Sequence, residues 1–483
     1  MNQQVIFQPA HALAQAIASQ SISAEEVLEA HLRHIAEHNP RLNSVATLDA
    51  EAARRKAKEC DRAVQDGEKV GPLHGVPMTI KDVFETEGLK TTCSFKPLAN
   101  HIPKQDATVV SRLKAAGAIV MGKSNVAMLA GDVQCNSPLF GRANNPWNEG
   151  CTPGGTTSGG AAAVASGMSP LEFGSDIAGS VRIPAHYCGI FSFKPTEHAV
   201  SMAGHIPEPP GAIRGVRRMA VAGPLARSIQ DLRIALEIAK GPDGRDMEVF
   251  PLPPPRFNAK RLADCRIATT KDLGLPITGD TAKAIDNAVI KLKKCGCVVE
   301  TASPNGFDYD EARRTHGQIA GTEISVSLPH VARQISRIVI PLKFRADPIV
   351  SAFRRGARLR LKDYAKALEV RDELKAMLDQ FLSGWDAWLC PVTASPAFTH
   401  RRSGKLIEID GEQLPYWTAT MGHTGMFNLT GHPVVVIPLG FSDDGLPIGA
   451  QLVGQRWRDL DLLAVAEAVA DCCALDQHPP GFG

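Results

Sequence analysis

Residues 150–195 contain two loops of small residues that carry hydroxyl groups, separated by a short alanine-rich run. The first loop, residues 154–160, reads Gly-Gly-Thr-Thr-Ser-Gly-Gly, and the second, residues 174–180, reads Gly-Ser-Asp-Ile-Ala-Gly-Ser. Glycines allow the backbone to approach a ligand closely. A serine beside successive backbone N–H groups suits acyl transfer, because negative charge develops on the carbonyl oxygen as the nucleophile adds. The apolar, alanine-rich context argues against a flexible Gly-Ser surface linker.

Lys81 follows a short apolar strand predicted at residues 78–80. Lysine is rarely buried without a partner, so this segment alone leaves two interpretations open. The lysine is paired with Asp82 or another acid, or it is a desolvated amine whose lowered pKa lets it act as a base. A nucleophilic serine needs such a base, and no histidine–acid pair is placed near Ser180. We therefore favour Lys81 as the base and expect a structural hydrogen bond from His186.

Residues 117–124 match the phosphate-binding pattern of nucleoside triphosphatases, but in the wrong context. Such a loop must follow a strand and open a helix. Here the first glycine follows a helix that we expect Asp106 to cap and Gly117 to end, and residues 118–121 are predicted as a buried strand. We therefore expect no phosphate site.

The remaining periodicities alternate between helix and strand, which favours an α/β fold. A capping box at Ser23 and Glu26 predicts a helix start, and residues 251–255 form a proline-rich break. Further helices are predicted at residues 50–66, from 161, at 228–240, 281–295, across 310–384 and at 460–473, and further strands at 266–269, 298–301, 388–391, 434–438 and 449–453.

Composition describes an ordinary globular protein: 483 residues, 44% hydrophobic and 22% charged, with a formal net charge of +2. A net charge this small does not indicate nucleic-acid binding, and no apolar run reaches membrane-spanning length. The first residues lack the layout of a signal peptide, and the 11 cysteines lack disulfide or zinc spacing. We therefore expect a cytoplasmic protein with reduced, mostly core thiols, no metal, and no nucleic-acid or membrane partner.

The two hydroxyl-bearing loops resemble those of the amidase signature family. The resemblance extends to residues 71–82, 145–148, 194–196, 223–228, 428–433 and 445–454, and so covers nearly the whole chain. It implies a single large domain over residues 1–483, with a mixed, twisted central β-sheet covered by helices on both faces. Within that domain we expect an N-terminal helical segment at 1–70, a catalytic signature core at 71–240 and a helical cover region at 310–384.

The family works with a Ser–Ser–Lys triad, whose middle serine adjoins a cis peptide and relays protons. Carried over, the resemblance implies Ser180 as the nucleophile and Lys81 as the base. The bridging position falls on Thr156, a departure from the family's serine that keeps the hydroxyl but restricts χ1. Ser158 would be the bridge only if the loop were realigned by two residues.

The oxyanion donors implied by the resemblance are the N–H groups of Ile177, Ala178 and Gly179 together with that of Ser180. Ala178 stands where many members have glycine. Asp176 and Arg182 are expected to hold the loop in place. Met128 and Leu129 are assigned to the substrate pocket from their position in the chain alone.

Three functions remain open at this point. The first is a stand-alone amidohydrolase for a small carboxamide, anilide or carbamate, with no cofactor, as a monomer or homodimer. The second is the glutaminase component of a tRNA-dependent amidotransferase, which belongs to the same family. The third is a non-catalytic binding protein on an amidase scaffold. The motifs do not identify the substrate.

Overall fold

In the computed structural model, residues 5–206, 214–257, 259–327, 347–475 and 477–482 are described. The strands are β1 (Val45–Leu48), β2 (Pro77–Lys81), β3 (Ile119–Ser124), β4 (Asn136–Ser137), β5 (Gly141–Arg142), β6 (Leu171–Asp176), β7 (Phe191–Lys194), β8 (Val221–Ala226), β9 (Arg266–Thr269), β10 (Val298–Thr301), β11 (Ala387–Pro391), β12 (Ile407–Ile409), β13 (Glu412–Leu414), β14 (Val434–Phe441) and β15 (Pro447–Val453). The α-helices are α2 (Ala10–Ala18), α3 (Ala24–Leu42), α4 (Ala50–Gln65), α5 (Thr108–Ala115), α6 (Ser158–Ala165), α7 (Arg182–Cys188), α8 (Ile229–Ala239), α9 (Gly279–Lys294), α10 (Tyr309–Val326), α12 (Pro348–Gly356), α13 (Leu361–Leu382), α14 (Tyr416–Met421), α15 (Gly425–Leu429) and α16 (Asp459–Cys473).

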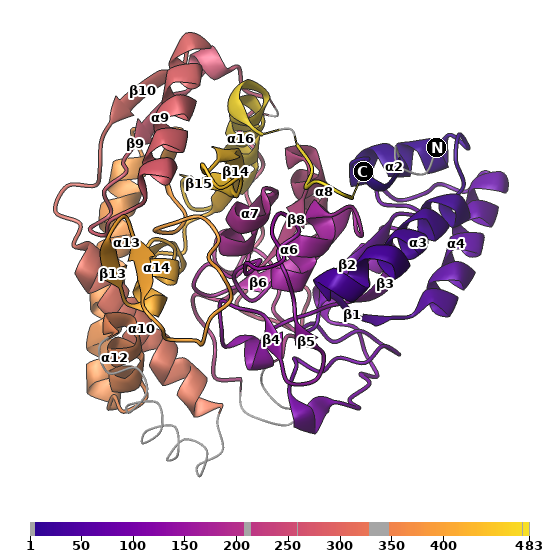
Figure 1. Cartoon of the computed structure of the whole chain (residues 1–483), viewed down its shortest axis with the longest axis horizontal. Coiled ribbons are helices and arrows are strands. Elements are labelled where there is room, and N and C mark those ends of the chain that lie inside the picture. Colours follow the sequence, from indigo (N-terminus) through magenta and orange to yellow (C-terminus); the bar gives the residue numbers. More distant parts are fainter. Residues whose placement is uncertain (1–4, 207–213, 258, 328–346, 476, 483) are drawn as a thin grey trace.

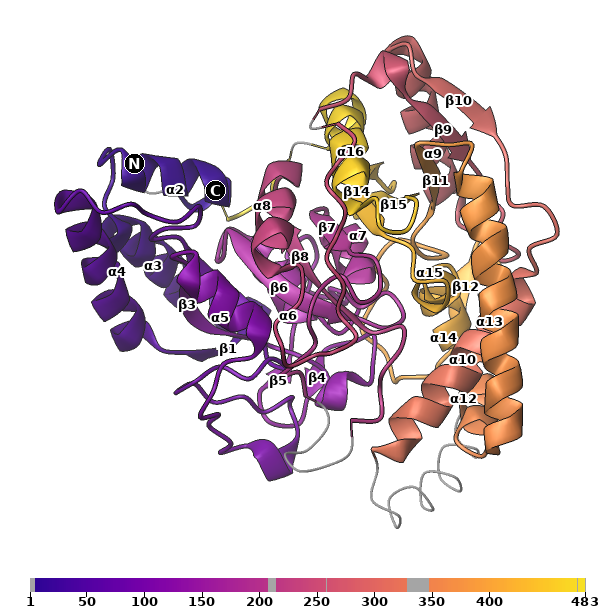
Figure 2. The ribbon, with the colours of Figure 1, turned by 180° about the vertical axis from the view of Figure 1, so that it is seen from behind.

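An 11-stranded mixed sheet crosses the molecule in the order β1-β3-β2-β6-β8-β7-β14-β15-β11-β9-β10 (Figure 1). Parallel pairs join β2 to β3 and β6, and β9 to β10 and β11. The other pairs in this sheet are antiparallel. Figure 2 shows from behind that the N-terminal helices α3 and α4 lie at one end of the sheet and α9 at the other.

Helices cover both faces of this sheet, as the alternation of buried side chains along single strands shows. In β14, Val435 and Ile437 belong to the core beneath α8 and α16, whereas Val436 belongs to the core beneath α6 and α7. In β11, Leu389 faces the first core, and Trp388 faces a third one beneath α10 and α13. Successive side chains of a strand point to opposite faces, so the strands are buried on both sides. The predicted fold class is confirmed.

Local sequence signals predicted most elements closely. The Ser23–Glu26 capping box is present at the start of α3, and Ser228 caps α8 through the N–H of Asp231. The strand expected from residue 118 is β3, so the phosphate-loop pattern has a strand in the place of its loop. The helix expected to start at residue 161 starts at Ser158.

The cap predicted for α5 is wrong. The N-cap residue is Ala107, which makes no side-chain cap. The carboxylate of Asp106 accepts hydrogen bonds from the N–H of Glu87, at 2.7 Å, and from Lys114 Nζ, at 2.9 Å. The Asp106 carboxylate is therefore engaged in tertiary contacts and does not cap the start of α5.

The helical pattern across 310–384 corresponds to α10, α12 and α13, with residues 328–346 outside the described part. All 11 cysteines are free thiols, and all are buried except Cys295, which is exposed, and Cys472, which is half-buried. No helix in the described ranges has both the length and the apolar content to cross a membrane. The subdivision of the domain at residues 70, 240 and 310 stays a prediction.

Candidate active site

The amine of Lys81 lies in the interior of the sheet, among hydroxyl groups and not beside an acid. Lys81 is the last residue of β2, between β3 and β6, and its side chain is fully buried. Its Nζ lies 2.6 Å from Thr156 Oγ1 and 3.1 Å from both the carbonyl oxygen and the Oγ of Ser175. The carboxylate of Asp82 turns elsewhere and accepts from the N–H of Thr92 at 3.0 Å. The ion-pair interpretation of Lys81 with Asp82 is therefore wrong.

Burial lowers the pKa of Lys81 to about 8, because removing water disfavours the ammonium form. Negative neighbours, among them Asp176 and Glu172, oppose this shift without cancelling it. An amine with this pKa is partly neutral at physiological pH and has a lone pair available for a proton.

Thr156 and Ser158 lie in the same loop, but their hydroxyls have different partners. Thr156 reaches Lys81, whereas Ser158 Oγ donates to the carbonyl oxygen of Gly154 at 2.9 Å and also to that of Gly155. Gly155 has a φ of +58°, and a Cβ there would lie 2.5 Å from Pro184 Cδ. Glycine is thus required to seat the loop against α7. The contacts favour Thr156 over Ser158 as the bridging hydroxyl.

The loop of Ser180 follows β6 and runs directly into α7. The N–H of Thr157 donates to the carbonyl oxygen of Ser180 at 3.1 Å, so the two hydroxyl-bearing loops are in contact. In the part of the chain that the structure describes, the Ser180 hydroxyl makes no hydrogen bond and the peptide bonds are all trans. The cis peptide that the resemblance implied is therefore not present here.

Asp176 and Arg182 form a fully buried ion pair that fixes this loop. Arg182 Nη2 lies 3.0 Å from Asp176 Oδ1, and the carboxylate also accepts from the N–H of Gly179 at 2.7 Å and of Val181 at 3.1 Å. Burial opposes ionisation of Asp176, but Arg182 and these N–H donors outweigh it and hold the pKa well below its usual range. Asn428 Nδ2 donates to the same carboxylate at 2.9 Å.

The predicted oxyanion donors differ in their availability. Gly179 N–H is engaged by Asp176, whereas within the described residues the N–H groups of Ile177, Ala178 and Ser180 donate to no protein acceptor. His316 Nε2 donates to the carbonyl oxygen of Ile177 at 2.8 Å. Because a peptide unit is planar and trans, holding that carbonyl also orients the N–H of Ala178 in the opposite direction.

The two residues assigned to the substrate pocket are Met128 and Leu129. Met128 is 49% exposed, and half-buried Leu129 packs against the large core with a φ of +52°. The role of both in a pocket stays a prediction. His186 makes the expected structural contacts: its Nδ1 accepts from the N–H of Gly449 at 2.7 Å, and its Nε2 donates to the carbonyl oxygen of Ser395 at 3.2 Å.

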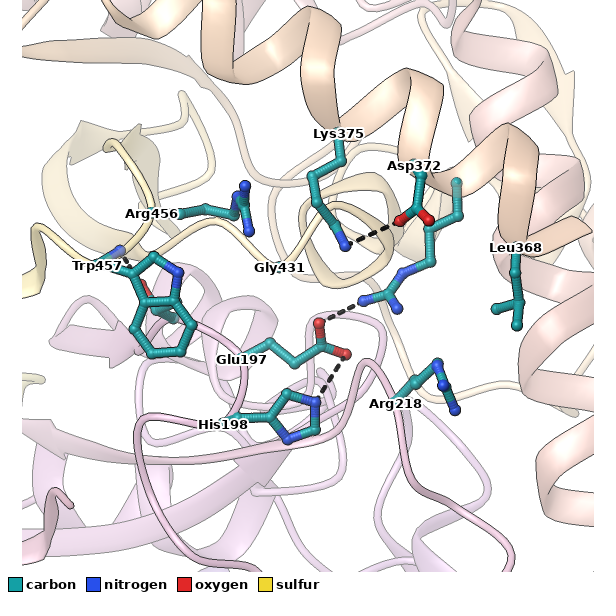
Figure 3. A pocket seen from close by; sticks show the side chains of 11 residues that line it. Glu197, His198, Arg218, Leu368, Asp372, Lys375, Gly431, Arg456 and Trp457 are labelled. Atoms are coloured by element: carbon teal, nitrogen blue, oxygen red, sulfur yellow. Dashed lines mark hydrogen bonds and ion pairs between the residues drawn. The ribbon is translucent and has the colours of Figure 1, made fainter. Parts of the chain in front are cut away.

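A cavity of about 320 Å³ lies elsewhere, between the loop after β7, helix α13 and the segment before α16 (Figure 3). None of the predicted catalytic residues lines it. Its four Arg and Lys side chains all form ion pairs, two of them with carboxylates outside the lining. The pairs are Arg371–Glu197 and Lys375–Asp372 within the lining, and Arg456–Asp379 and Arg218–Glu323 beyond it. Among the described residues, no group of three or more His, Cys, Asp or Glu side chains is placed to hold a metal ion.

Sequence reasoning missed the residues that reach this site from distant segments. Ser175 contacts Lys81, and His316 and Thr424 hold the carbonyl oxygens of Ile177 and Ala178. His316 and Thr424 lie in or beside elements far along the chain, where no local pattern distinguishes them from core residues. Ser175 lay within the quoted loop, and its position next to Asp176 was the one available signal.

Comparison with known proteins shows the family to which the chain belongs. A family model described as Amidase matches residues 26–463. An acylamidase from Rhodococcus erythropolis is 31% identical over 465 residues, covering 94% of this chain and 93% of that protein. A glutamyl-tRNA(Gln) amidotransferase subunit of Carboxydothermus hydrogenoformans is 33% identical over 477 residues, covering 94% of each.

A solved structure is also similar to this chain. It was described with a vestigial protein complex that reveals the evolutionary origins of an s-triazine catabolic enzyme. It superposes with a TM-score of 0.84 at 27% identity, covering 97% of this chain and 100% of that one. The fold and site thus define an amide-cleaving hydrolase. The chain belongs to the amidase family, the amidase signature enzymes.

Proposed function

We propose that this protein hydrolyses the C–N bond of a small-molecule carboxamide, anilide or carbamate through an acyl-enzyme on Ser180. Lys81 is the base and Thr156 the bridging hydroxyl. The observation that most supports the proposal is the 2.6 Å contact between Lys81 Nζ and Thr156 Oγ1, made by a fully buried amine. A base with a pKa near the working pH is suited to this task, and burial supplies that pKa.

The reaction then has two halves. Ser180 passes its proton to Thr156, Thr156 passes its own proton to Lys81, and Ser180 Oγ bonds to the carbonyl carbon. As the C–N bond breaks, Lys81 returns the proton through the Thr156 hydroxyl to the departing nitrogen. A water molecule then attacks the acyl carbon and loses a proton to the same base. The bond between that carbon and Ser180 Oγ breaks, the proton returns to Ser180 Oγ, and the acid is released.

The developing oxyanion requires N–H donors that point at it before the reaction. The N–H groups of Ile177, Ala178 and Ser180 are the available candidates, because that of Gly179 is hydrogen bonded to Asp176. The buried pair of Asp176 and Arg182 holds the loop and so contributes to this pre-organisation.

A second candidate is the glutaminase component of a glutamyl-tRNA(Gln) amidotransferase, supported by a relative from such an enzyme at 33% identity and similar length. It uses the same chemistry with glutamine as substrate and requires partner proteins. The third candidate, a binding protein without activity, rests only on the replacement of the family's serine by Thr156.

One experiment tests these candidates together. The purified chain alone is assayed against amides, anilides, carbamates and glutamine, with Ser180→Ala as the control. We expect turnover of a non-glutamine amide that Ser180→Ala abolishes while its melting temperature stays unchanged. Turnover retained by folded Ser180→Ala refutes the nucleophile. Glutamine hydrolysis that appears only with added partner proteins favours the second candidate, and failure of a fluorophosphonate to label Ser180 favours the third.

A further inference from the structure

A histidine is linked to the proposed base, Lys81, through the hydroxyl of Ser175. His205 Nε2 is 2.9 Å from Ser175 Oγ, and the same Oγ is 3.1 Å from Lys81 Nζ. His205 belongs to the segment between β7 and β8, 30 residues after Ser175. Its ring packs edge-on against Phe84 with centroids 5.1 Å apart, and its backbone forms a bridge with Phe84. The imidazole is thus held by the hydrogen bond to Ser175 Oγ and by the ring of Phe84.

The three contacts of Lys81 constrain where its lone pair can point. A neutral amine has two N–H groups and one lone pair. The carbonyl oxygen of Ser175 can only accept, so it takes one N–H. The second N–H and the lone pair of Lys81 are left for the hydroxyls of Thr156 and Ser175. One hydroxyl accepts the N–H, and the other donates its hydrogen to the lone pair.

The single hydroxyl hydrogen of Ser175 decides between these two arrangements. If Ser175 donates to His205 Nε2, its oxygen is left to accept from Lys81, and the lone pair faces Thr156. If Ser175 donates to Lys81 instead, the lone pair is occupied and Thr156 cannot give up its proton there. The first arrangement alone leaves the base ready for the bridging hydroxyl.

We propose that His205 is a positioning residue that accepts the hydrogen of Ser175 through Nε2 and thereby directs the lone pair of Lys81 to Thr156. This inference rests on the proposed function, because it assigns His205 a role in the same proton relay. When Lys81 takes up the proton, its three N–H groups match the same three oxygens, so Ser175 does not need to turn.

The surroundings keep His205 neutral, as an acceptor must be. Burial and the positive charges of Lys81 and Arg214 lower the pKa of His205 to about 3. The ring therefore retains an unprotonated nitrogen throughout the pH range in which Lys81 titrates.

The test compares His205→Phe, which keeps a ring but removes the acceptor, with His205→Asn, which restores a carbonyl oxygen. For His205→Phe we expect kcat to fall at least about tenfold with KM within about twofold, since the loss lies in proton transfer and not in binding. His205→Asn should recover part of that loss. The matched control is His34→Phe, a buried histidine bonded to the carbonyl oxygen of Ser166, which should keep the kcat of the wild type.

A folded His205→Phe variant with the kcat of the wild type overturns the inference, and so does equal kcat for His205→Phe and His205→Asn. If His205→Phe does not fold, Ser175→Ala tests the same chain from its other end, and unchanged kcat there also overturns it. Ser180→Ala and Lys81→Met separate the two proposals. Activity in either of these variants refutes the proposed function, whereas their inactivity beside a fully active His205→Phe refutes this inference alone.

Discussion

The pH dependence of turnover gives a sharp test of Lys81 as the base. With a pKa of about 8, the amine is protonated below that pH and cannot accept a proton from Thr156. The rate must therefore rise with pH, in proportion to the neutral fraction. That fraction is about one-tenth at pH 7 and about nine-tenths at pH 9, so kcat/KM should rise about tenfold between these pH values, and the slope of log kcat/KM against pH should approach one only below about pH 7.

Two other buried groups titrate in the same pH range as Lys81. Burial also lowers the pKa of Lys123 to about 8, and burial raises that of Glu172 to about 7. Lys123 Nζ donates to Thr86 Oγ1 at 2.9 Å and to the carbonyl oxygen of Phe84, and makes no hydrogen bond with Thr156 among the described residues. Lys123→Met is thus a matched control that should keep the rise near pH 8. Glu172→Gln should move the rise to lower pH, because the carboxylate charge favours the ammonium form of Lys81.

The assay measures kcat/KM for the best amide substrate from pH 6.5 to 9.5, with the folded state checked by circular dichroism at each end. A flat profile across this range would refute the reasoning. So would a rise that disappears in Lys123→Met while Lys81→Met remains active.

Three further predictions follow from the same contacts. Thr156→Ser should keep most of the activity and Thr156→Val should lose about a hundredfold in kcat, with Ser158→Ala near the wild type; the reverse order of Thr156→Val and Ser158→Ala would show that the bridge is misassigned. Lys81→Met should be inactive yet melt at the same or a higher temperature at pH 7. The lowered pKa means that burying the ammonium costs stability below about pH 8, a cost relieved as pH rises toward 10.5, and a marked fall in melting temperature would contradict this. His316→Phe should lower kcat about tenfold without changing KM, because the N–H of Ala178 loses its orientation; unchanged kcat would exclude that role.

Local signals in the sequence predicted most helix and strand positions because they act over a few residues. The capping box at Ser23 and the serine before α8 both formed as expected. Asp106 failed because Glu87 and Lys114 compete for its carboxylate, and no local pattern reports such a contact. The strand order could not be read either, since β14 pairs with β7 some 240 residues earlier in the chain.

The residues of the candidate site also fall into two groups, those that the sequence indicated and those that only the fold brings together. The resemblance brought Lys81, Thr156 and Ser180 to attention, and the structure adds the bond between Lys81 and Thr156. His205 and His316 remained unseen because their partners, Ser175 and the carbonyl oxygen of Ile177, lie 30 and 139 residues away. The engagement of backbone N–H groups likewise depends on the path of the folded loop, which residue types do not specify.

The most direct measurement of the central claim is the mass of the intact protein after reaction with a fluorophosphonate, followed by peptide mapping. The account predicts one adduct per chain, on the peptide that contains Ser180, absent in Ser180→Ala and much slower to form in Lys81→Met. An adduct on another residue, or labelling of Lys81→Met at the rate of the wild type, would contradict it.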